Sequence, residues 1–199
     1  MLFGVSLSLA CSCSHTDKSA DDLIDYVMAR QLAERQHLTG RRTEYTFDTL
    51  NGASWLKTKL FEVGIPGLIH GDRYIVGLDK EGRFFDVYEP FTLKEPDFTT
   101  IVDTKALVDV NSVSEFIALI ERIYSANAVE FKILRTSDDV SDLFRRKAVP
   151  LSIEEKSGGW EIEFTAVVEG FGDSKRSLVH TRIQIDRNND TIALESKPL

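Results

Sequence analysis

The chain has 199 residues, of which 42% are hydrophobic and 10% aromatic. This composition excludes a disordered tail, a collagen-like fibre and a disulfide-stapled miniprotein, and the length suffices for one globular domain with a substantial core. Lys and Arg total 24 against 32 Asp and Glu, so the formal net charge is −8. Because an acidic surface repels phosphate backbones, we expect no nucleic-acid partner.

The N-terminal stretch carries no formal charge before Asp17. Residues 2–10 form a mostly apolar run that is too short to cross roughly 30 Å of hydrocarbon as a helix, but long enough for the core of a secretion signal. The run ends in Leu9-Ala10-Cys11 and therefore resembles a bacterial lipoprotein signal, whose lipobox places a small residue before a cysteine. The resemblance implies cleavage after Ala10 and a lipid anchor on the Cys11 thiol.

On this hypothesis residues 1–10 are a signal segment, residues 11–19 a polar tether, and residues 20–199 a single globular domain at the cell envelope. Ser8 stands where Leu is usual in a lipobox, and no Lys or Arg precedes the apolar run. The alternative is a short strand or tail with two incidental thiols, in a cytoplasmic or secreted soluble protein. A metal site on the two cysteines is disfavoured, since no His or Cys follows at ligand spacing.

The first half of the domain is predicted to contain two helices and a hairpin. In chain order the patterns indicate a helix over residues 20–38, a weak strand over 41–48, a second helix over 51–63, and a hairpin of strands 73–78 and 83–88. The first helix has Ser19 as its N-cap and acidic residues in its first turn. The hairpin connection ends at Gly82, which we expect to be left-handed.

The middle of the chain is predicted to alternate between strands and helices. A strand over residues 98–102 precedes a helix that opens with a capping box over residues 112–115. The buried stripe of that helix consists of Phe116, Leu119, Ile120 and Ile123. A strand over residues 129–134 and a short helix over residues 137–147 follow.

Four consecutive strands are predicted in the C-terminal third, over residues 151–155, 160–168, 178–186 and 191–197. With turns centred on Ser157-Gly158, Gly172-Asp173 and Asn188-Asn189, the register pairs Ile153 with Ile162, Phe164 with Leu151 and Thr181, Ile183 with Ile162 and Leu194, and Ile185 with Ile192. All apolar side chains then lie on one face. We therefore predict an α+β fold, in which an antiparallel sheet with a C-terminal four-stranded meander packs helices on one face, similar to cystatin and NTF2-type folds in general architecture only.

The polar face of this sheet holds the main candidate for acid–base chemistry. In the predicted register Glu163 stands opposite Arg182, with His180 nearby. A carboxylate and a histidine in a dry pocket suit proton transfer, whereas a solvated ladder of charge pairs explains the same residues. A second candidate is His70 beside Asp72, on a Gly-rich stretch before the hairpin, for which a local turn is the alternative.

An aromatic cluster is the candidate for a partner surface. Five aromatic side chains fall close together in the sequence, namely Phe84, Phe85, Tyr88, Phe91 and Phe98. Alternation sends Phe84 and Phe85 to opposite faces of their strand, so one of them is available to line a groove or a partner surface unless a helix covers it.

No nucleophile elbow, HExxH motif or phosphate-binding glycine loop occurs in the sequence, and whether the chain is an enzyme stays open. We predict a lipid-anchored binding or interaction protein of the bacterial cell envelope, with a protein or small ligand as partner and membrane contact only through the anchor. The alternatives are a small acidic inhibitor or immunity-type protein of a basic partner, and a hydrolase or isomerase that uses a sheet cavity. We expect no cofactor and no metal, since the Asp-rich turn over residues 186–190 lacks the Gly and Glu of a calcium loop.

Overall fold

The computed structural model describes residues 18–33, 41–50, 53–64, 73–87, 96–126, 130–136, 148–169 and 177–199. Several sequence predictions lie outside these residues, namely the signal segment with Cys11, the candidates His70, Asp72, Tyr88 and Phe91, the helix over 137–147 and the turn at Gly172-Asp173. None of the described helices is long and apolar enough to span a membrane.

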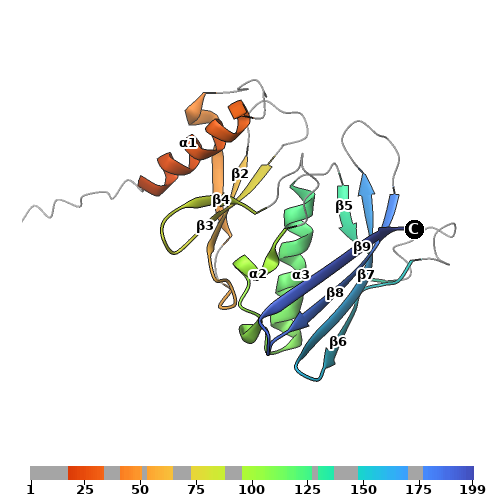
Figure 1. The fold of residues 1–199 in the computed structure, drawn as a ribbon. Helices are drawn as coiled ribbons and strands as arrows, with labels where there is room; N and C mark the ends of the chain where they lie inside the picture. Colours follow the sequence, from red (N-terminus) through yellow and green to blue (C-terminus); the bar gives the residue numbers. More distant parts are fainter. Residues whose placement is uncertain are drawn as a thin grey trace, which may run out of the picture.

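The chain folds as α+β, with two antiparallel sheets on either side of a central helix (Figure 1). The first sheet has the order β1-β2-β3-β4 and consists of β1 (Thr46–Leu50), β2 (Lys59–Gly64), β3 (Arg73–Leu78) and β4 (Phe84–Asp86). The second has the order β5-β7-β8-β9, with β6 also paired to β7, and consists of β5 (Glu130–Ile133), β6 (Ser152–Lys156), β7 (Gly159–Glu169), β8 (Ser177–Asp186) and β9 (Thr191–Pro198). The α-helices are α1 (Lys18–Ala33), α2 (Phe98–Ile101) and α3 (Val110–Ser125), and short 3-10 turns are η1 (Arg42–Glu44) and η2 (Thr104–Ala106).

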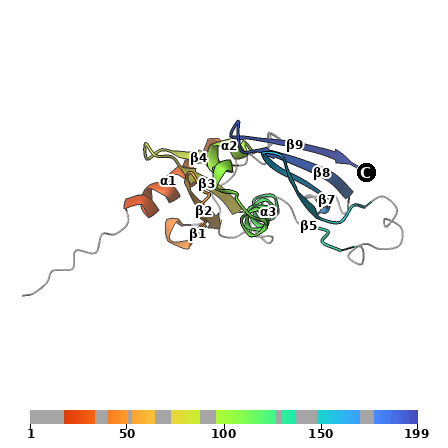
Figure 2. The same ribbon diagram turned by 90° about the horizontal axis from the view of Figure 1, so that it is seen from below.

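The elements form four layers, which Figure 2 shows from below. α1 covers one face of the first sheet, where Leu23 and Val27 share a buried cluster with Phe61. The other face of this sheet joins, through Leu60, the large core that α3 shares with the second sheet. The predicted α+β class with a C-terminal meander is confirmed, and helices cover one face of the second sheet as expected. The first sheet, in contrast, has helices on both faces.

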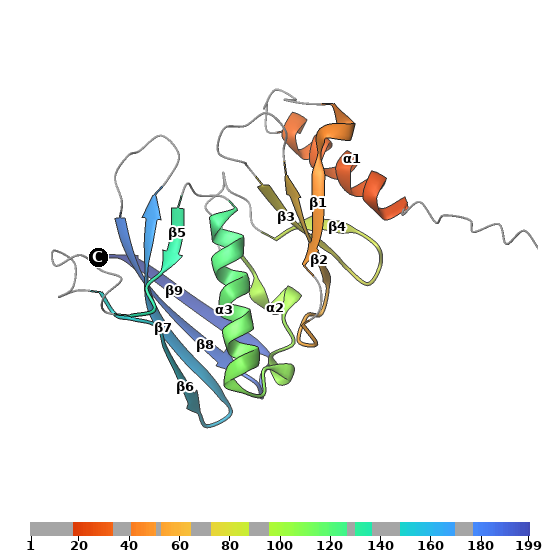
Figure 3. The ribbon, with the colours of Figure 1, turned by 180° about the vertical axis from the view of Figure 1, so that it is seen from behind.

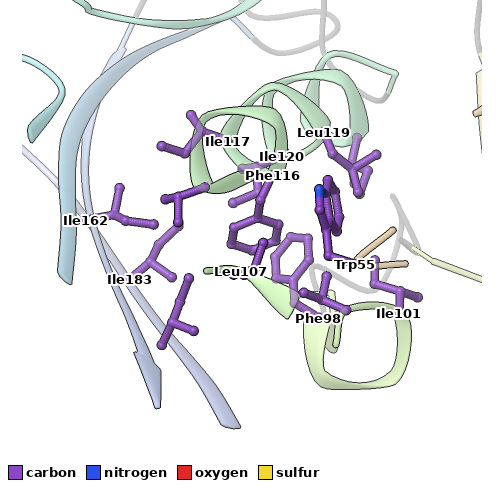
Figure 4. Close-up of a cluster of buried hydrophobic side chains, with 14 of the residues drawn as sticks. Trp55, Phe98, Ile101, Leu107, Phe116, Ile117, Leu119, Ile120, Ile162 and Ile183 are labelled. Atoms are coloured by element: carbon purple, nitrogen blue, oxygen red, sulfur yellow. The ribbon is translucent and has the colours of Figure 1, made fainter. Parts of the chain in front are cut away.

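The large core lies between α3 and the second sheet (Figure 4). The stripe predicted for this helix is buried as expected and consists of Phe116, Leu119, Ile120 and Ile123. Phe98 of α2 meets Phe116 edge-on, with ring centroids 5.5 Å apart and ring planes at 88°. Ile162 and Ile183 close the core from the sheet side.

The helix predicted over residues 51–63 is wrong, because the second part of this segment is strand β2. Leu60 faces the core around α3, whereas Phe61 and Val63 face α1. Four consecutive residues of β2 are buried, from Leu60 to Val63, so its apolar residues do not alternate with exposed ones, and their positions also fit helical spacing. The presence of a helix on each side of the sheet therefore explains the error.

The strand predicted over residues 98–102 is also wrong, because it contains helix α2. The Asp97 carboxylate accepts a hydrogen bond from the Thr99 backbone N–H at 3.1 Å and so caps the helix. Phe98 and Ile101, one turn apart, both point into the core. Only Val102 is extended, and it forms an isolated bridge with Leu56.

Three helix and strand boundaries also differ from the predictions. α3 begins at Val110 with Asp109 as its N-cap, and Ser112 is the third helical residue of the capping box rather than its first member. Ser19 lies inside α1 instead of at its N-cap, because the helix begins earlier. In the segment predicted as a weak strand, the Arg41 backbone N–H donates to the Glu44 carboxylate at 3.0 Å, which closes the turn η1 and delays the strand to Thr46.

The register predicted for the C-terminal strands is confirmed, except that the predicted pair of Phe164 with Leu151 lies outside the observed ladder, because β6 begins at Ser152. The observed pairs are Ile153 with Ile162, Ile162 with Ile183, Phe164 with Thr181, Ile183 with Leu194 and Ile185 with Ile192. Gly158 has a left-handed φ of 87° and Gly82 one of 78°, as their turns require. In the last turn it is Asp190, with φ 51°, that takes this conformation rather than Asn188 or Asn189. The prediction that all apolar side chains lie on one face is wrong at one end of the sheet, where Leu178 packs against Leu134 outside the large core.

Candidate functional site

The structure brings together His180 and Glu163, two residues predicted for acid–base chemistry. The His180 Nε2 lies 3.0 Å from the Glu163 Oε1, and the His180 side chain is only 12% exposed. Glu163 is the Cα partner of Arg182, as predicted. The Arg182 side chain nevertheless bonds Glu161, with its Nε 2.6 Å from the Oε1, and the Glu163 carboxylate meets His180 instead.

Glu163 borders a shallow hollow of about 250 Å³ on the outer face of the second sheet. The hollow is lined by polar side chains, namely Ser152, Glu154, Lys156, Glu161, Glu163 and Arg182. The hydrogen bond from Lys156 lowers the pKa of Glu154, and the hydrogen bond to Glu161 raises the pKa of Arg182. These charges are paired with one another, which is the arrangement of a solvated ladder of cross-strand pairs.

The described aromatic residues of the predicted partner surface do not gather on one surface. Phe98 is buried in the core beside α3. Phe84 packs on the α1 side of the first sheet, with its ring centroid 5.7 Å from that of Tyr26. Phe85 lies on the opposite face, and its ring covers Gly77 so closely that an added Cβ would lie 2.2 Å from it. The two residues therefore alternate along β4 as expected, and each face is covered.

A groove of about 500 Å³ lies between the first sheet and α3, and no sequence pattern indicated it. Figure 3 shows α3 running alongside the first sheet, seen from behind. The end of β1 and the segment after it line one side, and the exposed side of α3 lines the other. The lining residues are Thr49, Leu50, Ala53, Trp55, Leu56, Glu115, Ala118, Leu119 and Arg122.

Trp55 forms the base of the groove and is held from three sides. The residue is 3% exposed, and its ring packs edge-on against Phe116, with centroids 6.0 Å apart. Its carbonyl accepts a hydrogen bond from the Asp103 backbone N–H at 2.7 Å. Its indole Nε1 donates to the Glu115 Oε2 at 3.2 Å. The base of the groove is thus anchored to the core, and Glu115 is oriented by it.

Arg122 marks the other charged position in the groove. Its Nε donates to the Glu62 Oε2 at 2.5 Å, and Arg73 donates to the other oxygen of the same carboxylate. The Glu62 side chain is only 5% exposed, whereas that of Arg122 is 48% exposed. A buried carboxylate that binds two arginines thus holds the guanidinium of Arg122 in place.

Glu115 and Arg122 lie on the same side of α3, with Ala118 between them. They are seven positions apart, which corresponds to two helical turns and roughly 10 Å along the axis. The groove therefore presents an acidic and a basic side chain, carried by helix positions about 10 Å apart along the axis, over an apolar base. Ala118 is small and exposed, but a single small residue on a helix does not by itself indicate a groove.

The Asp-rich turn at the end of β8 is occupied by protein contacts. Asp186 accepts hydrogen bonds from the backbone N–H groups of Asn188 at 2.8 Å and Asn189 at 3.1 Å. The Asp190 Oδ2 lies 2.8 Å from the Lys57 Nζ. Within the part of the chain that the structure describes, no three His, Cys, Asp or Glu side chains are placed to hold a metal ion.

Comparisons with protein families, with curated proteins and with solved structures found no match to this chain. The groove and the hollow are therefore interpreted from their own chemistry.

Proposed function

We propose that this chain is a lipid-anchored binding protein of the bacterial cell envelope, and that it holds its ligand in the groove between β1 and α3. The Leu9-Ala10-Cys11 sequence supports the anchor, and the small polar residues after it suit a tether. The groove supports binding, because an apolar base with a few placed polar groups is what small-ligand sites use for affinity and orientation.

The observation that carries the proposal is that both charged groups of the groove are already held in place. Trp55 orients Glu115, and Glu62 orients Arg122. Side chains that are ordered before the ligand arrives lose less conformational entropy on binding, so more of the interaction energy appears as affinity. A solvated surface pair has no such support from a buried partner.

Binding of 1-anilinonaphthalene-8-sulfonate tests the groove, since this probe combines apolar rings with an anionic group. We expect its fluorescence to rise with the wild-type chain, and Ala118→Trp to weaken its binding at least about tenfold. Ala118 is exposed on α3 and lines the groove, so an indole fills the groove without entering the core.

Ser114→Trp is the matched control, because Ser114 is exposed one turn earlier on α3 and does not line the groove. This variant should bind the probe like the wild type. Equal binding by wild type and Ala118→Trp, or equal losses in both variants, contradicts the proposed site.

The His180–Glu163 contact favours a second candidate function, a hydrolase that uses the outer hollow. A carboxylate 3.0 Å from an imidazole nitrogen is the arrangement that orients a general base. Hydrolysis of p-nitrophenyl acetate that disappears in both His180→Gln and Glu163→Gln supports this candidate. Wild-type rates equal to those of both variants contradict it.

A further inference from the structure

We infer that the groove takes a short peptide of about three residues with free ends, extended and antiparallel to β1. The inference rests on the proposed function and adds the chemical class of the ligand. It follows from the position of β1 at the edge of its sheet among the described strands, from the direction of α3 and from the two charged side chains that line the groove.

β1 is the edge strand of its sheet. It pairs with β2 and, among the strands that the structure describes, with no other. Its first residues, Thr46 to Asp48, are exposed, and its last, Thr49 and Leu50, line the groove. An edge strand presents backbone N–H and C=O groups to an extended peptide, which can add to the sheet as a further strand.

The directions of β1 and α3 follow from their contacts. Asp48 of β1 is the Cα partner of Glu62, the carboxylate that holds Arg122 near the end of α3. Trp55 follows the end of β1 and bonds Glu115 in the first half of the helix. β1 therefore runs from the Arg122 end of the groove toward the Glu115 end, and α3 runs the opposite way.

A peptide with free ends matches the charges in this geometry. Its ammonium group pairs with Glu115 and its carboxylate with Arg122, so it runs along α3 and antiparallel to β1. Antiparallel pairing is the more stable arrangement for an added strand. Three extended residues at about 3.4 Å each span roughly the 10 Å of helix axis between the positions of Glu115 and Arg122.

The same charges argue against a fatty acid in the groove. Its carboxylate can pair with Arg122, but its hydrocarbon tail would then lie against the Glu115 carboxylate. Burying a carboxylate against hydrocarbon without a cationic partner is unfavourable. The occupant that satisfies both ends of the groove is a zwitterion with an apolar middle.

Calorimetric titration of the full chain with the tripeptide Leu-Ala-Leu tests the inference. We expect the free tripeptide to bind at least about tenfold more tightly than its C-terminal amide or its N-acetyl form, because each blocked end loses one charge-assisted contact. In Arg122→Gln, the amide and the free acid should bind alike, while acetylation still weakens binding. In Glu115→Gln, the N-acetyl form and the free tripeptide should bind alike, while amidation of the C-terminus still weakens binding.

Arg73→Gln is the matched control for Arg122→Gln. It also removes one arginine from Glu62, but Arg73 does not line the groove. This variant should therefore keep the preference for a free carboxylate. If Arg73→Gln loses that preference as Arg122→Gln does, the loss does not show that Arg122 binds the peptide carboxylate, and the inference is overturned.

Equal affinity for free and blocked tripeptides overturns the inference. Tighter binding of a hexapeptide or of palmitate does so too, since it indicates a protein segment or a fatty acid as the occupant. The proposed function survives each of these results as long as Ala118→Trp still prevents binding of the anilinonaphthalene probe. If that effect is absent as well, both proposals fail.

Discussion

Lys57 and Asp190 join the two sheets, although they lie 133 positions apart in the sequence. The Lys57 Nζ donates to the Asp190 Oδ2 at 2.8 Å and to the Thr99 carbonyl at 3.0 Å. The other oxygen of Asp190 accepts a hydrogen bond from the Thr104 hydroxyl at 2.9 Å. Lys57 precedes β2 of the first sheet, and Asp190 precedes β9 of the second. One carboxylate therefore connects both sheets to the segment between α2 and α3.

Two substitutions of Asp190 separate its charge from its backbone conformation. We expect Asp190→Asn to lower the free energy of unfolding by about 1 kcal/mol, because the pair with Lys57 is partly exposed. Asp190→Ala should cost about 1 kcal/mol more, because alanine tolerates the left-handed φ of 51° less well than asparagine. Urea unfolding followed by tryptophan fluorescence measures both. Equal losses in the two variants contradict a role for the backbone conformation.

The same carboxylate makes stability depend on pH. The hydrogen bond from Lys57, followed by that from Thr104, lowers the pKa of Asp190. A group whose pKa is lower in the folded chain stabilises the fold above its unfolded pKa of about 4, and this stabilisation is lost as the pH falls through the folded pKa. We expect the free energy of unfolding to fall below about pH 4, with a smaller fall in Asp190→Asn. An unchanged pH profile in this variant contradicts the assignment.

The start of α3 can be tested by two alanine substitutions. Asp109 is the N-cap and accepts a hydrogen bond from the Ser112 backbone N–H at 2.8 Å. Asp109→Ala should lower the melting temperature by about 3 °C. Ser112→Ala should lower it by less, because alanine keeps the backbone N–H that Asp109 accepts and loses only the hydroxyl contacts with the Asp109 N–H at 3.2 Å and the Asp109 carbonyl at 2.8 Å. Circular dichroism measures the melting curves. A larger effect of Ser112→Ala would indicate that the helix begins at Ser112, as its sequence pattern predicts.

Glu62 is expected to matter more for stability than any exposed carboxylate. Glu62→Gln replaces a buried acceptor of two arginine hydrogen bonds, so we expect a loss of about 2 kcal/mol in the free energy of unfolding. Glu154→Gln is the control, since Glu154 is exposed and, within the described part of the chain, forms its ion pair with Lys156. It should unfold like the wild type in urea. Similar urea unfolding curves for Glu62→Gln and Glu154→Gln would contradict a contribution of the buried Glu62 carboxylate to stability.

The lipid anchor can be tested with the two cysteines of the N-terminal stretch. In a bacterium that processes lipoproteins, the wild-type chain and Cys13→Ser should enter the detergent phase of the membrane fraction, and Cys11→Ser should not. The lipobox motif places the acylated thiol at position 11, so Cys13 serves as the matched control. Mass spectrometry of the N-terminal peptide identifies the modification. Identical fractionation of all three chains excludes the anchor.

The pairing of the C-terminal strands in the second sheet could be predicted from local sequence patterns. Its register, with Ile183 between Ile162 and Leu194, follows from the alternation of apolar residues and from short turns such as that at Gly158. A slip of one residue would turn every buried side chain to the outer face, so the sequence specifies this sheet strongly. The buried stripe of α3 is equally local, since a helix brings residues three and four apart to one side.

The strand β2 and the groove depend instead on residues that are distant in the sequence. β2 is buried on both faces because α1 packs on one of them and the core around α3 on the other, and the sequence of the strand does not indicate which faces are covered. Trp55 and Glu115 are 60 positions apart when they meet at the base of the groove, and so are Glu62 and Arg122. The periodicity of the chain by itself determined the meander and the stripe, because both arise from neighbours along one strand or helix. Tertiary packing alone decided where the first sheet meets α3, and with it the position of the two charges that flank the groove.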